Sequence, residues 1–155
     1  MSCADATDDT VAFYNRTLID LAAQAGDEHS LPAATHRATA RSPICGSVVD
    51  VFLTLDETAR VAGFGYRLEA CALTKSVVAV MKTAIIGATR ADIAQAHAAL
   101  GLLLEGDGEG ASALWPDERW AGMMILAPLK DHRVRHNAMQ LPFEAAEKAF
   151  DNRVI

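Results

Sequence analysis

Two cysteines stand in local sequences that suit metal or sulfur chemistry. Cys45 lies between Pro43 and Gly46, where proline restricts the approach of the chain and glycine permits a turn. Cys71 lies where an alternating pattern gives way to a helical one, so its thiol would meet the positive end of a helix, which favours the thiolate. The thiolate is the form that binds metal ions. The residues alone leave open that both cysteines are small buried hydrophobic side chains.

Other candidate ligands are less well placed. His132 and His136 are four residues apart and would share one helix face, but no glutamate follows the first histidine as in zinc proteases, which favours a solvated basic turn. Cys3 falls in residues 1–8, which we expect to form a mobile tail. Three cysteines make no disulfide framework, so we expect a reducing, cytoplasmic environment.

An antiparallel hairpin is expected between Cys45 and Cys71. Residues 48–55 and 60–68 each alternate between two faces, as half-buried strands do. The inward face of the first strand is either Val49, Val51, Leu53 and Leu55 or the set that contains Phe52. On the second strand Gly63 and Gly65 share a face, where another segment can pack closely. Because a hairpin brings its ends together, both thiols should lie within reach of one ion.

Helices are expected on both sides of this hairpin. Apolar residues recur at helical spacing over 8–25 and 70–86, and Thr89 with Asp92 resembles a capping box that begins a helix reaching residue 104. We expect a loop at 27–43, with a third strand before Cys45 left open, a flexible connector at 106–110, a short helix or turn at 115–126 and a last helix at 131–152.

These elements predict one α+β domain over residues 1–155. Its small antiparallel sheet would have two or three strands, with helices mainly on one face and the helical segment 77–86 against the apolar side. The net charge of −6 argues against a nucleic-acid partner. Lys75, Lys82 and Arg90 interrupt the most apolar region, which argues against a membrane span.

The order of these parts resembles the NifU/IscU/SufU-type iron–sulfur cluster scaffolds. Residues 42–47 (Ser-Pro-Ile-Cys-Gly-Ser) are similar to the first cysteine loop of that family, Asn-Pro-x-Cys-Gly-Asp. Residues 70–74 (Ala-Cys-Ala-Leu-Thr) are similar to its second cysteine motif, Gly-Cys-Ala-x-Ser. The resemblance runs from about Tyr14 to Phe150 and implies an IscU/SufU-like fold and a scaffold rather than an enzyme.

The departures from the family pattern bear directly on the implied site. Ser47 replaces the acidic residue that follows the first cysteine loop. Residues 135–138 (Arg-His-Asn-Ala) match the family's Arg-x-x-Cys motif but put Ala138 where the third cysteine belongs. The resemblance therefore implies a divergent member that holds iron or a cluster through Cys45 and Cys71, with Ser47 and Ala138 lining the site and His136 as a further candidate ligand.

Three functions are compatible with these residues. The first is a scaffold or carrier of an iron–sulfur cluster such as a 2Fe–2S cluster, which normally takes four protein ligands. The second is a regulator that holds zinc or accepts persulfide, and the third is a binding module of the same fold without metal chemistry. The resemblance implies a cysteine desulfurase and cluster-accepting apo-proteins as partners. A homodimer would supply four thiolates from two pairs.

Overall fold

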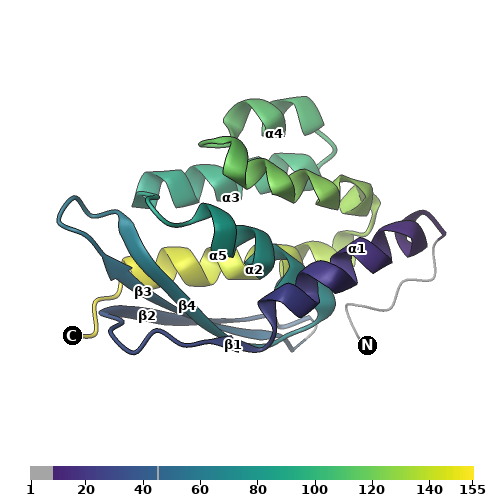
Figure 1. Cartoon of the computed structure of the whole chain (residues 1–155). Helices are drawn as coiled ribbons and strands as arrows, with labels where there is room; N and C mark the ends of the chain where they lie inside the picture. Colours follow the sequence, from purple (N-terminus) through teal and green to yellow (C-terminus); the bar gives the residue numbers. More distant parts are fainter. Residues whose placement is uncertain (1–8, 45) are drawn as a thin grey trace.

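The computed structural model describes residues 9–44 and 46–155, and the side chains of residues 16–44 and 46–155. The predicted tail, residues 1–8, and Cys45 therefore lie outside the described residues. Figure 1 shows an antiparallel sheet with helices stacked on one face, which confirms the α+β prediction. The elements are α1 (Asp9–Ala25), β1 (Glu28–His29), β2 (His36–Arg41), β3 (Val48–Leu55), β4 (Val61–Glu69), α2 (Ala72–Ala84), α3 (Arg90–Leu104), α4 (Gly108–Leu114), the 3₁₀ segments η1 (Glu118–Asp131) and η2 (Arg133–Arg135), and α5 (His136–Phe150).

The sheet has four strands in the order β1-β4-β3-β2, all antiparallel. The predicted β3–β4 hairpin is present. Residues 36–41 form β2, the third strand that the sequence left open before Cys45, and residues 28–29 form β1. The sheet therefore has four strands rather than the two or three expected, and only the rest of 27–43 is loop. Pro32 and Pro43 flank β2 without entering it, so neither removes a hydrogen bond from the ladder. β1 has only two residues, which are too few for an alternating pattern to be visible in the sequence.

Alternation places the core on one side of the β3–β4 hairpin. Val49, Val51 and Leu53 are fully buried, so the first of the two candidate faces of β3 turns inward. A register shift between Thr54 and Leu55 makes Val61, rather than Ala62, the first buried residue of β4. The buried residues of β3 pair with residues on the same side of β4, namely Phe64, Tyr66 and Leu68.

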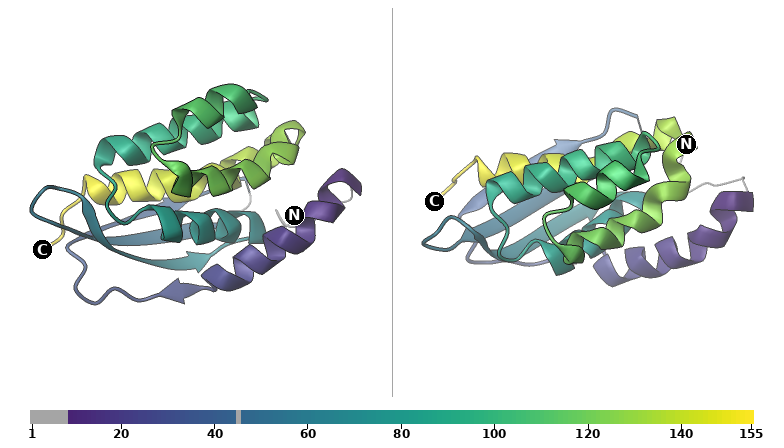
Figure 2. Two further views of the ribbon diagram at one scale, coloured as in Figure 1. Left: turned by 45° about the horizontal axis from the view of Figure 1, so that its top comes forward. Right: turned by 90° about the horizontal axis from the view of Figure 1, so that it is seen from above.

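The helices form two layers above the sheet (Figure 2). α2 and α5 lie over the sheet with α1 beside α2, and α3, α4 and η1 form the outer layer. The Ser76 hydroxyl donates to the carbonyl of Leu18 at 2.7 Å, which ties α2 to α1. The Tyr66 hydroxyl donates to the carbonyl of Ala25 at 2.7 Å and fixes the end of α1 against β4.

Two helical segments differ from expectation. α4 occupies most of the predicted flexible connector, because the Asp107 carboxylate accepts the Gly110 backbone N–H at 2.9 Å and caps the helix. The last helix begins at His136 rather than near residue 131, because η1 and η2 occupy the residues before it. The predicted capping box of α3 is confirmed, with reciprocal hydrogen bonds between Thr89 and Asp92.

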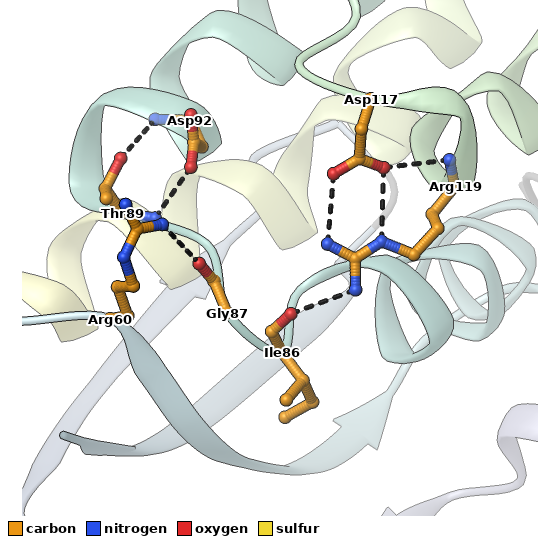
Figure 3. A network of polar contacts seen from close by, with 7 residues as sticks. All are labelled: Arg60, Ile86, Gly87, Thr89, Asp92, Asp117 and Arg119. Carbon is orange, nitrogen blue, oxygen red and sulfur yellow. Dashed lines mark hydrogen bonds and ion pairs between the residues drawn. The ribbon is translucent and has the colours of Figure 1, made fainter.

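A polar network fixes the turn that follows α2 (Figure 3). The Arg119 guanidinium donates two hydrogen bonds to the Asp117 carboxylate and a third, at 3.0 Å, to the carbonyl of Ile86. Arg60 donates to the next carbonyl, that of Gly87, at 2.9 Å. Hydrogen bonding from Arg119 also lowers the pKa of Asp117. The two arginines thus hydrogen-bond consecutive carbonyls of the turn between α2 and α3.

Close packing on the outer face of the sheet requires glycine in β4, as the sequence predicted. A Cβ atom on Gly65 would lie 2.6 Å from the Leu31 Cβ and 2.7 Å from the His29 carbonyl oxygen. Gly65→Ala should therefore lower the free energy of unfolding by about 1–3 kcal/mol in urea denaturation. Gly101→Ala is the matched control: its Cβ meets nothing within 4 Å, and alanine in a helix should raise stability by about 0.5–1 kcal/mol. Equal effects of both substitutions would contradict this packing.

The segment after α5 returns to the outer edge of β2. The Val154 N–H donates to the Thr35 carbonyl at 2.8 Å, and His36 and Arg153 form a bridge. His36 is buried, with 9% of its surface exposed. Burial, and to a lesser extent the charge of Arg153, lowers the pKa of His36 below its usual value of 6.5.

The lowered pKa of His36 predicts a pH dependence of stability. The unfolded chain takes up this proton at a higher pH than the folded chain, so the free energy of unfolding should fall as pH decreases through 6.5 and level off once the folded state is protonated. His36→Gln should flatten this part of the profile in urea denaturation at several pH values. Arg153→Gln should flatten it less, because burial is the larger cause. An unchanged slope in His36→Gln would contradict the assignment.

Candidate functional site

The loop that carries Cys45 and the start of α2 lie together at one end of the sheet. The loop joins β2 to β3 and is closed by a hydrogen bond from the Ser42 N–H to the Ser47 carbonyl at 2.8 Å. Gly46 has φ +72°, which a glycine adopts without strain. At the same end β3 begins opposite the end of β4, with Val48 paired to Glu69. The hairpin thus brings the two cysteine motifs together.

A hydrogen bond joins the two motifs directly. The Cys71 backbone N–H donates to the Ser47 hydroxyl oxygen at 3.4 Å. Cys71 occupies the N-cap position of α2 and is partly exposed. Ser47 is buried, with 3% of its surface exposed. The distance between the Cys45 and Cys71 sulfurs stays a prediction, because Cys45 lies outside the described residues.

Thr74 connects Cys71 to the beginning of α5. Its hydroxyl is 3.5 Å from the Cys71 sulfur and 2.9 Å from the carbonyl oxygen of Ala138, to which it donates. Thr74 is fully buried and Ala138 is 1% exposed. Position 138, where the family motif has its third cysteine, thus lies next to the contacts of Cys71. It contributes a backbone carbonyl there and no metal-binding side chain.

The structure places the two candidate histidines at the start of α5 and just before it. His136 is the first residue of α5, and its Nε2 donates to the carbonyl of Leu129 at 3.1 Å. The helix thus begins at His136 itself and no loop separates the two, and a ligand role for His136 stays a prediction. His132 lies in the turn between η1 and η2. In the part of the chain that the structure describes, no three His, Cys, Asp or Glu side chains gather to hold a metal ion.

One polar atom near Ala138 is left without a hydrogen bond. The Oδ1 atom of Asn137 is buried, and no donor reaches it from the described residues. A buried acceptor of this kind costs about 1–3 kcal/mol unless a further group satisfies it. The first turn of α5 therefore carries an unmet acceptor one residue before the position of the missing cysteine.

Two residues at this end of the molecule, Thr74 and Pro142, are not among the site residues expected from the sequence. A signal was present, because Pro142 lies four residues after Ala138 and has no N–H for the Ala138 carbonyl. Which side chain replaces that donor depends on the tertiary structure.

Two solved structures with this architecture are described as a NifU-like protein and as a scaffold of the SUF system. The N-terminal part of a nitrogen-fixing NifU-like protein from Brucella abortus has a TM-score of 0.79 and 28% identity, covering 92% of this chain and 96% of that one. This match confirms the resemblance to the NifU/IscU/SufU-type family. A proposed iron–sulfur cluster assembly scaffold protein for the SUF system, from Fervidobacterium islandicum AW-1, shares the NifU/IscU/SufU-type fold with a TM-score of 0.72 and 16% identity, over 86% of this chain and 93% of that one.

The other comparisons add no family assignment. No protein-family model matches the chain, and the search of curated proteins finds no match. None of the helices in the described residues combines the length and apolar character needed to cross a membrane.

Proposed function

We propose that this protein is an iron–sulfur cluster assembly scaffold or carrier that holds iron or a cluster, as cargo, through the thiolates of Cys45 and Cys71. The observation that carries the proposal is the hydrogen bond between Ser47 and the Cys71 backbone, in a NifU/IscU/SufU-type fold. That bond joins the two cysteine-bearing segments at the open end of the hairpin. A fold neighbour described as a cluster assembly scaffold supports the general role.

The side chains of one protomer fit cargo that is held weakly. Cys45 and Cys71 supply two thiolates, and Ala138 supplies no third. Binding of a metal ion by a thiol releases its proton to solvent, so each cysteine contributes one negative charge to the complex. The remaining ligands come from solvent or from a second protomer, whose own pair would complete a set of four thiolates. Weak retention suits a carrier that passes its cargo on.

The proposed partners follow from this chemistry. A cysteine desulfurase would supply sulfur to a scaffold, and apo-proteins that lack their cluster would receive the product. Cys71 is partly exposed at the N-cap of α2, and Ile44, next to Cys45, is 57% exposed. An exposed apolar side chain in the loop that carries the first cysteine motif is compatible with protein docking at this end of the molecule. We place the protein in the cytoplasm as part of the same proposal.

The buried Ala138 favours a second candidate function. Two thiols without a third ligand also suffice to hold zinc with solvent ligands or to accept a persulfide sulfur on one cysteine. The same fold without metal chemistry would act as a binding module. Metal analysis of the purified protein separates these outcomes, because a cluster contains iron and sulfide, a zinc regulator contains zinc, and a binding module contains neither.

Anaerobic reconstitution with iron and sulfide tests the proposal. Ala138→Cys should increase retained iron by about tenfold at limiting iron, because it restores a third thiolate beside the contacts of Cys71. Cys45→Ser and Cys71→Ser should each reduce iron and sulfide content, measured by metal analysis and by the visible absorption of the cluster. Cys3→Ser is the matched control and should behave as the unmodified protein.

Equal iron content in the unmodified protein, Ala138→Cys and Cys71→Ser would contradict the scaffold proposal. The binding-module alternative would then be the better account. Loss of iron in Cys3→Ser would move the site into the N-terminal residues and would equally contradict the assignment to Cys45 and Cys71.

A further inference from the structure

Pro142 alters the hydrogen bonding of the α5 backbone beside the candidate site. In an α-helix the carbonyl of residue 138 accepts the N–H of residue 142, but proline has no N–H. The Ala138 carbonyl is buried with its residue, of which 1% is exposed, so bulk water does not replace this donor. The hydroxyl of Thr74, from α2, reaches the carbonyl oxygen at 2.9 Å and donates to it. A side chain of α2 therefore supplies the hydrogen bond that Pro142 removes from α5.

This bond determines how Thr74 meets the Cys71 sulfur. A hydroxyl carries one hydrogen, and a carbonyl oxygen only accepts. Once that hydrogen is given to Ala138, the Thr74 oxygen presents lone pairs to the sulfur 3.5 Å away. The thiol of Cys71 is then the donor in this contact. A chain of hydrogen bonds runs from the Cys71 thiol through the Thr74 hydroxyl to the Ala138 carbonyl.

We propose that Thr74 is a positioning residue that could strengthen metal binding at Cys71 but is kept from doing so, because Pro142 commits its only hydrogen to α5. A sulfur bound to a metal carries no hydrogen and is stabilised by hydrogen bonds donated to it. Thr74 donates such a bond only by turning away from Ala138, which leaves a buried carbonyl without a donor. Binding of cargo at Cys71 thus competes with the contact between α2 and α5.

The metal part of this inference rests on the proposed function, whereas its hydrogen-bond part does not. The two parts are therefore tested separately, with one set of variants. Pro142→Ala restores an N–H at position 142, so the helix satisfies Ala138 and the Thr74 hydroxyl is free to turn to the sulfur. Thr74→Val removes the hydroxyl with little change of shape. Thr74→Ser keeps the hydroxyl, and Pro128→Ala, in η1, is the control for loss of a proline.

Denaturation of the metal-free protein tests the hydrogen bonds. Thr74→Val should raise the unfolding equilibrium constant by about tenfold when residue 142 is proline, because the Ala138 carbonyl loses its donor. In the Pro142→Ala background the same substitution should raise it by no more than about threefold. Thr74→Ser should have a small effect in both backgrounds. Equal effects of Thr74→Val in both backgrounds would overturn the proposed link between Pro142 and Thr74.

Titration with Co²⁺ under anaerobic conditions tests the effect on metal binding, read from the thiolate charge-transfer absorption. Pro142→Ala should bind Co²⁺ about tenfold more tightly than the unmodified protein, and Thr74→Val should abolish this gain. Thr74→Ser should preserve the gain, and Pro128→Ala should show none. A gain that persists in the double variant Pro142→Ala, Thr74→Val would overturn the inference, as would no gain at all.

The two measurements separate failure of the inference from failure of the proposed function. Absence of thiolate absorption in every variant, together with the expected denaturation results, would overturn the proposed metal binding and leave the hydrogen-bond chain established. Absorption that Cys71→Ser removes, without any change in Pro142→Ala, would overturn the role of Thr74 in metal binding and leave Cys71 as a ligand.

Discussion

The antiparallel pairing of β3 with β4 is the constraint on which the candidate site depends. Val48 opposes Glu69, so the loop before β3 and the helix after β4 leave the sheet at the same end. The hydrogen bond from the Cys71 N–H to Ser47 then joins them. The buried inner faces of the two strands hold this register, since a slip by one residue would turn apolar side chains to solvent.

The third element of the site, α5, reaches it through its backbone. Where the family motif has a cysteine, Ala138 gives only a carbonyl, which Thr74 binds. Position 138 thus keeps a place beside the contacts of Cys71 and has lost its metal-binding atom. Pro142 adds a second difference, because it commits the Thr74 hydroxyl to α5. Under the proposed function, both differences predict that cargo is retained less firmly than three thiolates would retain it.

The sequence was sufficient for the parts of the fold with strong local patterns. Alternation predicted the hairpin, and Thr89 with Asp92 predicted the start of α3. The short alternation of β2, flanked by two prolines, leaves open from the sequence alone whether a third strand precedes Cys45. Glycines around α4 suggested a connector, although Asp107 caps a helix there.

Some features of the candidate site follow from local sequence patterns, whereas others depend on contacts between distant parts of the chain. The spacing of Cys71 from the hairpin predicted its place at the start of α2. The role of Thr74 could not be predicted, because it depends on which side chain lies nearest to a carbonyl 64 residues away. The start of α5 at His136 likewise depends on the η1 and η2 segments before it, and it decides where the His136 side chain points.

X-ray absorption at the zinc edge tests the central claim most directly, because it counts the sulfur atoms bound to a metal ion. The protein loaded anaerobically with one equivalent of Zn²⁺ should show sulfur ligands at about 2.3 Å, and fewer of them in Cys45→Ser and in Cys71→Ser. A zinc shell that contains only oxygen and nitrogen, or one that neither substitution changes, would contradict the assignment of the two cysteines to one metal site.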